Sequence, residues 1–167
     1  MQDRRNVIVG GALLAGAAAI PGTVRAALTP GSAAEQFAAR LSAHDIEGFA
    51  ALFSDDYINH QLSAAATSPK GIPPKQGTVA YFRARLAGMP DLMVHIETQV
   101  VAGDKVAASF VYEGTHQGPY FGVAPTGRKL HFTSCDIFRV QDGKIVEHWG
   151  MGDIAGILAQ LRGPAAT

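Results

Sequence analysis

The chain has 167 residues, of which 47% are hydrophobic, and its 14 basic and 14 acidic residues give a formal net charge of zero at pH 7. This length suits one domain with one core, and the charge balance gives no reason to expect nucleic acid or an anionic membrane as a partner. The single cysteine, Cys135, excludes an internal disulfide. Nothing around Cys135 would activate it, so we expect a buried structural thiol.

Residues 1–26 have the pattern of an export signal. Arg4-Arg5 precedes an uncharged run from Val7 to Ile20 that is too short for a stable membrane anchor. The paired arginines resemble a twin-arginine signal, and a general secretory signal is the alternative. We expect cleavage after Ala26 and a free periplasmic or secreted protein of residues 27–167. Loss of three arginines and one aspartate with this segment turns the 14 basic and 14 acidic residues into 11 and 13, a net charge of −2.

The first half of the remaining chain reads as helical. Apolar residues recur at helical spacing in three segments: 33–43, 45–53 and 79–88. Ser32 is the expected N-cap of the first helix and forms a capping box with Glu35, three residues later. Asp45 is the expected N-cap of the second helix. Tyr57 to Gln61 is expected to be extended, and residues 62–75, which hold three prolines, form a surface loop.

The second half changes to alternating apolar and polar residues, which predicts strands. The four predicted strands cover residues 93–101, 105–113, 129–140 and 144–151. Gly103-Asp104 and Asp142-Gly143 mark antiparallel hairpins, and a last short helix follows Asp153. Helices followed by a meander indicate an α+β fold, in which three N-terminal helices pack on the concave face of a strongly bent antiparallel sheet. The glycine-rich loop 115–127 would lie at the rim of the cavity.

Asp136 is the strongest candidate for chemistry. In the strand 129–140, Asp136 shares one face with Leu130, Phe132, Ser134 and Phe138. A carboxyl group among such neighbours costs several kcal/mol to ionise unless a partner stabilises it, and this suits it to proton transfer. The alternative is a buried aspartate that only accepts structural hydrogen bonds.

The partner of Asp136 depends on the hairpin loop that follows its strand. A three-residue loop places Asp136 opposite His148, whereas a two-residue loop places it opposite Trp149, because one step of register exchanges the faces. We expect the three-residue loop, since it puts Asp136 and His148 together and sends Glu147 to the other face beside Arg139. An Asp–His pair would offer an acid and a base.

Two further histidines could orient a substrate carbonyl: His60, which follows Tyr57 and Asn59, and His116, which begins the rim loop. Taken singly, such histidines are more often surface or hydrogen-bonded side chains. No spacing matches a local metal-ligand pair, so no metal site is predicted. The absence of Gly-x-Ser-x-Gly, phosphate-loop and dinucleotide motifs argues against serine hydrolases, kinases and nicotinamide enzymes.

Four stretches together carry a family resemblance: Gly114–Gly118, Pro125–Arg128, Asp136–Val140 and Asp142–Trp149. They resemble the SnoaL-like polyketide cyclases, also called ester cyclases, of the nuclear transport factor 2-like superfamily. The resemblance covers roughly Ala33 to Leu161. It implies an α+β cone, commonly dimeric, with a pocket in which an aspartate moves protons without any cofactor.

The resemblance also assigns residues. Asp136 matches the family's catalytic aspartate, and His148 matches a position near the pocket. The expected substrate-binding residues are Tyr57, Asn59, His60, His116, Phe132, Phe138 and Trp149. Gly150 departs from the family, because many relatives carry an acidic residue there, and the export signal is a second departure.

These observations lead to one expected function and one alternative. We expect an exported, homodimeric acid/base enzyme without metal or cofactor that acts on a small carbonyl-containing substrate, by aldol cyclisation, isomerisation or dehydration. The alternative is a non-catalytic small-molecule-binding domain of the same fold. The fold alone cannot choose between them, because it hosts many activities.

Overall fold

Three helices precede the four strands of the meander, as predicted, with β1 between the second and third helices and a fourth helix at the end. The computed structural model describes residues 27–61 and 71–163, so the predicted export signal in residues 1–26 lies outside the described residues. The elements in chain order are α1 (Pro30–Ser42), α2 (Ile46–Ala50), β1 (Phe53–Asn59), α3 (Pro74–Gly88), β2 (Met93–Ala102), β3 (Lys105–Thr115), β4 (Lys129–Gln141), β5 (Lys144–Gly152) and α4 (Ile154–Arg162). No helix within these residues combines the length and apolarity needed to cross a bilayer.

The helix ends follow capping chemistry, with two differences from the sequence prediction. Thr29, not Ser32, is the N-cap of α1, and Ser32 occupies the third helical position of a capping box with Thr29. The predicted cap at Ser32 was wrong. Asp45 caps α2 as predicted, accepting a hydrogen bond from the backbone of Gly48 at 2.8 Å. Phe53, expected in this helix, instead begins β1.

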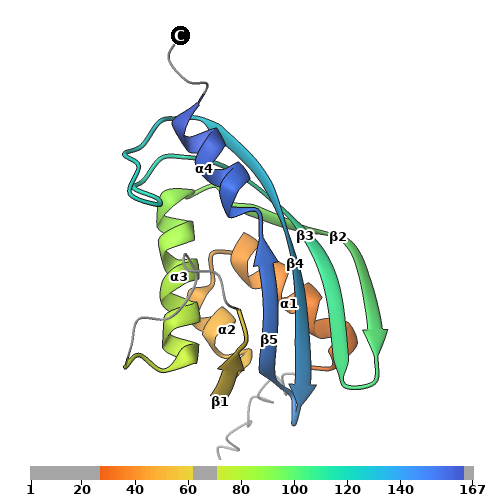
Figure 1. Cartoon of the computed structure of the whole chain (residues 1–167). Helices are drawn as coiled ribbons and strands as arrows, with labels where there is room; N and C mark the ends of the chain where they lie inside the picture. Colours follow the sequence, from red (N-terminus) through yellow and green to blue (C-terminus); the bar gives the residue numbers. More distant parts are fainter. Residues whose placement is uncertain (1–26, 62–70, 164–167) are drawn as a thin grey trace, which may run out of the picture.

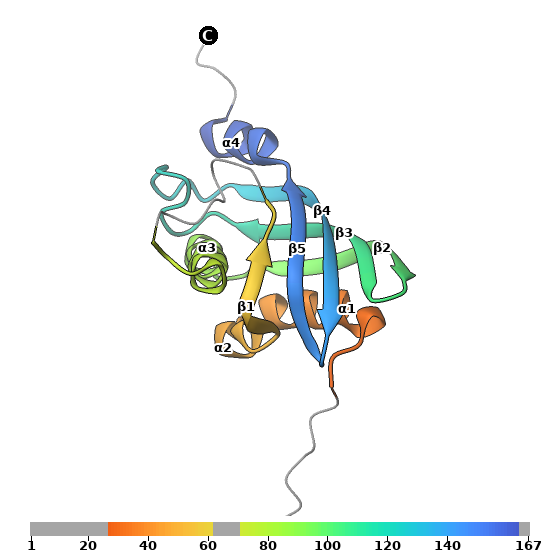
Figure 2. The same cartoon turned by 60° about the horizontal axis from the view of Figure 1, so that its bottom comes forward.

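The sheet has the order β1-β5-β4-β3-β2 (Figures 1 and 2). The pairs from β2 to β5 are antiparallel, as predicted, whereas β1 runs parallel to β5, so the sheet is mixed. The parallel pairing was not predicted, because a short extended segment does not indicate which strand it will join. Figure 2 shows α1, α2 and α3 gathered on one side of this sheet, and α1 contacts β2, β3 and β4. The α+β fold class is confirmed.

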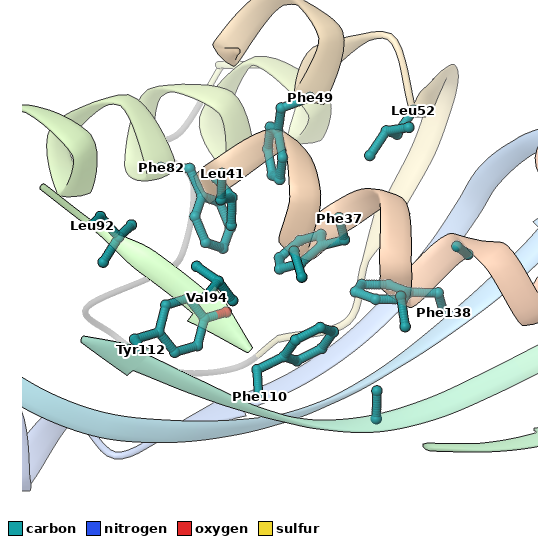
Figure 3. Packing of buried hydrophobic residues seen from close by; sticks show 14 of the residues in the cluster. Phe37, Leu41, Phe49, Leu52, Phe82, Leu92, Val94, Phe110, Tyr112 and Phe138 are labelled. Carbon is teal, nitrogen blue, oxygen red and sulfur yellow. The ribbon is translucent and has the colours of Figure 1, made fainter. Parts of the chain in front are cut away.

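Aromatic side chains fill the space between α1, α2, α3 and the sheet (Figure 3). Phe37 on α1 is fully buried, and its ring centroid lies between 5.0 and 5.3 Å from those of four other phenylalanines. These partners are Phe49, Phe82, Phe110 and Phe138. Such clusters combine a large buried apolar area with favourable ring geometry.

Along β4, buried and solvent-facing residues alternate as the sequence predicts. Leu130, Phe132, Asp136 and Phe138 point toward the helices, and Cys135 lies on the outer face. Cys135 is exposed, so the predicted buried thiol was wrong. The outer face of β4 has no helix over it at this point, and a residue's position on a pleat, not its apolar character, decides its burial.

Candidate active site

Asp136 on β4 and His148 on β5 form a buried hydrogen-bonded pair. The carboxyl Oδ1 of Asp136 lies 2.7 Å from Nε2 of His148. The two residues are only 6% and 2% exposed. Because a carboxylate loses its hydration at such a depth, its ionised form depends on hydrogen-bond donors supplied by the protein. The structure therefore brings together the two residues predicted to be catalytic.

The hairpin that joins β4 and β5 has a two-residue loop. Gln141 pairs directly with Lys144, and Asp142 and Gly143 between them have φ angles of 50° and 72°. Positive φ at both central residues matches the right-handed twist of the flanking strands. The predicted three-residue loop was therefore wrong. By itself, a two-residue loop would have placed Trp149 opposite Asp136.

A bulge in β5 changes the register beyond the loop. The strand pairing shifts by one residue at Val146, so that Asp136 faces Gly150 and Phe138 faces His148. Directly paired residues share a face, and so do residues two apart on one strand. His148 thus returns to the face of Asp136 and meets it diagonally. The predicted pair exists, but through a different register from the expected one.

Gly150 leaves the room that the pair occupies. A Cβ atom at this position would lie 2.5 Å from Oδ1 of Asp136 and 2.6 Å from Nε2 of His148. Both distances are far below van der Waals contact, so a side chain at position 150 would displace one of the two groups. The absence of a side chain at position 150 is what leaves room for this hydrogen bond.

A chain of hydrogen bonds reaches His148 from the helical side. Asn59 donates to Thr78 at 3.4 Å, Thr78 donates to the Tyr57 hydroxyl at 3.4 Å, and this hydroxyl lies 3.0 Å from Nδ1 of His148. Burial raises the pKa of Tyr57, with a smaller contribution from Asp136, so its hydroxyl stays protonated and can donate. With Tyr57 as donor to Nδ1, the imidazole proton sits on Nε2 and is donated to Asp136.

The second carboxyl oxygen of Asp136 also has a donor. Ser134 Oγ donates to Oδ2 at 2.5 Å and lies 3.4 Å from the hydroxyl of Tyr112 on β3. Both carboxyl oxygens of Asp136 therefore have a hydrogen-bonding neighbour, Ser134 at Oδ2 and His148 at Oδ1, and these contacts fix the orientation of the carboxyl group.

His60 and Trp149, both predicted to bind substrate, lie apart from the pair. Their rings stack at 4.4 Å with an interplanar angle of 3°. His60 Nε2 lies 2.7 Å from Glu147, which also accepts a hydrogen bond from Arg139, as expected for the outer face. Hydrogen bonds from His60 and Arg139 lower the pKa of Glu147. This outer cluster is separated from Asp136 by the sheet itself.

The other predicted contacts lie on the inner side. The ring of Phe138 is 5.1 Å from that of His148, and Phe132 stacks on Tyr112 at 5.0 Å. His116 is fully buried, and its Nδ1 lies 2.9 Å from the hydroxyl of Thr126. These three side chains are therefore placed on the same concave wall as Asp136.

Four surface cavities of the described residues do not have Asp136 or His148 in their lining. The largest of these four, about 680 Å³, lies between the start of β4 and α4. Within the described ranges, no group of three or more His, Cys, Asp and Glu residues is placed to hold a metal ion. The pair itself is buried beside core side chains, among them Phe138, whose ring centroid lies 5.1 Å from that of His148.

Sequence reasoning missed Arg85, Thr78 and Tyr112, which all lie at the inner wall. Arg85 is buried on α3, three residues after the core residue Phe82. That spacing places both on one helix face, so the periodicity of the segment could have indicated a buried arginine. Tyr112 lies two residues after Phe110 on β3, so the alternation of buried and less buried residues that predicts a buried Phe110 also predicts a buried Tyr112. Thr78 gave no comparable signal.

Solved structures share this architecture. IdmH of Streptomyces antibioticus, a proposed polyketide cyclase, is 32% identical, with a TM-score of 0.68 over 80% of this chain and 99% of that one. AclR of Streptomyces galilaeus is 24% identical, with a TM-score of 0.69 over 83% of both chains, and supports the fold alone.

Sequence comparison gives the family. Nogalonic acid methyl ester cyclase of Streptomyces nogalater is 34% identical over 115 residues, which cover 66% of this chain and 84% of that protein. The family model described as SnoaL-like polyketide cyclase matches residues 32–161, which include both members of the buried pair. The family model covers most of the chain and the fold agrees with it, so the chain belongs to the SnoaL-like polyketide cyclase family.

Proposed function

We propose that the chain is a cofactor-free acid/base enzyme that acts on a small carbonyl-containing substrate, with Asp136 as the base. The observation that carries the proposal is the buried Asp136–His148 pair, in which both carboxyl oxygens receive hydrogen bonds. The likeness to a methyl ester cyclase supports the same class of chemistry. A buried carboxyl group in contact with a histidine offers a base together with a side chain that orients it.

The proposed reaction begins with proton transfer from a carbon next to a carbonyl group. The carboxylate of Asp136 accepts this proton, and the electron pair of the broken C–H bond forms an enolate. In an aldol ring closure, the enolate carbon attacks a second carbonyl, and the resulting alkoxide takes the proton back from Asp136. Isomerisation would return the proton to another carbon instead. In each case Asp136 ends the cycle ionised.

His148 acts on the substrate through Asp136 in this scheme. Its Nε2–H holds Oδ1, while Tyr57 holds Nδ1, so the carboxylate is oriented before the substrate arrives. A preoriented base lowers the entropic cost of reaching the transition state. The proposed substrate contacts on the inner wall are Tyr57, Asn59, His116, Phe132 and Phe138.

Substrate access requires side chains to move, because core residues enclose the pair within the described part of the chain. The proposed route is the end of the sheet where the rim loop begins at His116. Phe132 on the wall beside it is 3% exposed. A closed interior would exclude water from the enolate once the substrate is bound.

The direct test measures the exchange of α-protons for deuterium in D₂O. ¹H NMR monitors the exchange in a set of small ketones and 1,3-dicarbonyl compounds. The full chain should accelerate exchange for at least one of them. Asp136→Asn should lower this rate by about 10²–10⁴-fold, the usual contribution of a positioned acid or base. Asp104→Asn, at the exposed β2–β3 hairpin, is the matched control and should keep the rate.

Equal exchange rates for wild type and Asp136→Asn would overturn the proposal. If ligands still bound, and binding were lost on substitution of Phe132 or Phe138, the alternative of a non-catalytic binding domain would be the better account. Thermal shift gives the binding readout, since a ligand at a hundred times its dissociation constant adds about 2.7 kcal/mol of stability.

Export and dimerisation complete the proposal. The arginine pair and apolar run of residues 1–26 support export to the periplasm or beyond, and N-terminal sequencing of the protein from an expressing cell should begin after Ala26. Sedimentation of that protein should give the mass of a homodimer. A cytoplasmic, unprocessed chain would contradict the proposed export. A monomer would contradict the proposed dimer.

A further inference from the structure

A buried arginine lies in an aromatic cage on the helical side of the core. Arg85 on α3 is 4% exposed, and its guanidinium carbon lies between 4.6 and 5.2 Å from four ring centroids. The four rings belong to Tyr81, Phe82, Tyr112 and Phe132. Interaction with ring faces offsets part of the cost of burying a cation, though less than a carboxylate would.

The positive charge of Arg85 has no counter-ion among the described residues. No described Asp or Glu oxygen lies within 4.0 Å of it. Its hydrogen bonds go to two neutral hydroxyls, from Nε to Tyr120 at 3.0 Å and from Nη2 to Tyr81 at 2.8 Å. A guanidinium carries five N–H donors, so three of them lack a described acceptor.

Ionised tyrosines do not supply the missing negative charge. Burial raises the pKa of Tyr120 to about 12, and it also raises the pKa of Tyr112. Both hydroxyls are therefore neutral at physiological pH. Burying a charge without an ionic partner costs free energy. An anion from outside the chain would offset this cost at Arg85.

Arg85 lies close to the proposed catalytic base. Its guanidinium carbon is 4.6 Å from the ring centroid of Tyr112. The hydroxyl of Tyr112 is 3.4 Å from Ser134 Oγ, which donates to Asp136. One tyrosine and one serine thus separate the cation from the carboxylate along the inner wall.

His116 offers a second unused donor at the same end of the core. The backbone N–H of Thr126 donates to Nδ1 of His116 at 3.3 Å, so the imidazole proton sits on Nε2. Nε2 is buried and has no hydrogen-bond partner among the described residues. A donor left in this state costs free energy unless a ligand completes it.

Hydrogen bonds join the loop of His116 to the helix of Arg85. The backbone N–H groups of Gln117 and Gly118 donate to the carbonyl of Gly88, three residues after Arg85, at 2.9 and 3.1 Å. Tyr120 of the same loop accepts the Nε bond of Arg85. The two unused donor groups therefore belong to one joined unit of α3 and the rim loop.

We infer that Arg85, together with His116 on the adjoining rim loop, forms a subsite for an anionic oxygen group, and that the ligand of this protein carries a carboxylate. A carboxylate matches the planar fork of a guanidinium and accepts several N–H bonds at once. That this carboxylate compound is also a substrate rests on the proposed function, because the anion would then be held one residue layer from Asp136. The binding itself does not depend on catalysis.

The test compares carboxylates with their neutral amides on the full-length protein by isothermal titration calorimetry. The pairs are acetate with acetamide, pyruvate with pyruvamide, and benzoate with benzamide. At least one carboxylate should bind 10-fold or more tightly than its amide. Arg85→Gln should weaken that carboxylate by about 10- to 100-fold, the range expected for hydrogen bonds to a charged group. Arg83→Gln, on the exposed side of the same helix, should leave it unchanged.

Further variants separate failure of the subsite from failure of the proposed function. Asp136→Asn should retain or tighten carboxylate binding even when α-proton exchange is lost. Arg85→Lys keeps the charge without the planar fork and should give intermediate affinity, which guards against a folding defect in Arg85→Gln. Absence of any carboxylate preference in the wild type, or unchanged preference in Arg85→Gln, would overturn the subsite whatever the exchange assay shows.

Discussion

Nε2 of His148 lies 2.7 Å from a carboxyl oxygen of Asp136, although Gly150, and not His148, faces Asp136 across the two strands. The contact is diagonal, and it uses space that a side chain at position 150 would fill. The pair therefore depends on two local features of β5, the bulge at Val146 and the glycine at 150.

Gly150→Ala should break this arrangement. Its Cβ would lie 2.5 Å from Asp136 Oδ1, so we expect a loss of about 1–3 kcal/mol in the free energy of unfolding, as for other overpacked sites. The rate of α-proton exchange should fall as well. Gly152→Ala is the matched control, since the nearest atoms to its Cβ would lie 3.9 Å away. Urea unfolding and the exchange assay measure both effects, and equal behaviour of the two variants would contradict the steric argument.

Tyr57→Phe removes one oxygen atom from the buried hydrogen-bond chain. Nδ1 of His148 and Oγ1 of Thr78 then each lose a partner, and the unfolding free energy should drop by about 1–3 kcal/mol. The ¹⁵N chemical shift of His148 Nδ1 should also change, because Nδ1 then lacks its hydrogen-bond donor while Asp136 still holds the proton on Nε2. NMR of the labelled imidazole measures this shift. An Nδ1 shift identical to that of the wild type would show that Tyr57 does not donate to Nδ1.

Glu147→Gln should alter stability on the acid side. Hydrogen bonds from His60 and Arg139 lower the pKa of Glu147 in the folded chain below its ordinary value of 4.5. The unfolded chain then binds the proton more readily, so this stabilisation is present above pH 4.5 and is lost as pH falls through the lower, folded value. The variant should be less stable at neutral pH and should lose less stability on acidification. Chemical unfolding at several pH values measures this.

The control for that experiment is Glu47→Gln, an exposed residue of α2 paired with Arg83 at 3.2 Å. Exposed ion pairs contribute little to stability, so its unfolding curve should follow that of the wild type at each pH. If Glu147→Gln lost as much unfolding free energy on acidification as the wild type, the hydrogen bonds of His60 and Arg139 to Glu147 would not contribute to stability as argued.

Phe37→Ala tests the aromatic core that supports the inner wall. The substitution removes ring contacts with Phe49, Phe82, Phe110 and Phe138 at once, and the expected loss is about 3–5 kcal/mol in urea unfolding. Val100→Ala, at a position that is 65% exposed, should change stability by less than about 0.5 kcal/mol. A mild effect of Phe37→Ala would mean that the core collapses readily around the lost ring.

Much of the fold could be predicted because its signals are local. The strands β2 to β5 and the caps at Asp45 and Asp153 follow from alternation and capping within a few residues of sequence. The cap of α1 was misassigned because Thr29 and Ser32 both satisfy the capping pattern, and the choice between them depends on where Pro30 starts the helix. The parallel pairing of β1 with β5 joins segments far apart in the chain, and no local pattern indicated it.

By itself, the sequence determined that Asp136 shares a face with Phe132 and Phe138, since the period of a strand is a property of the backbone alone. The tertiary structure decided which side chains meet that face. The bulge at Val146 brings His148 to Asp136 and leaves Trp149 outside, and the packing of α3 encloses Arg85 among aromatic rings. Register and helix packing depend on the summed contacts of distant residues, so they become visible only when the chain is folded.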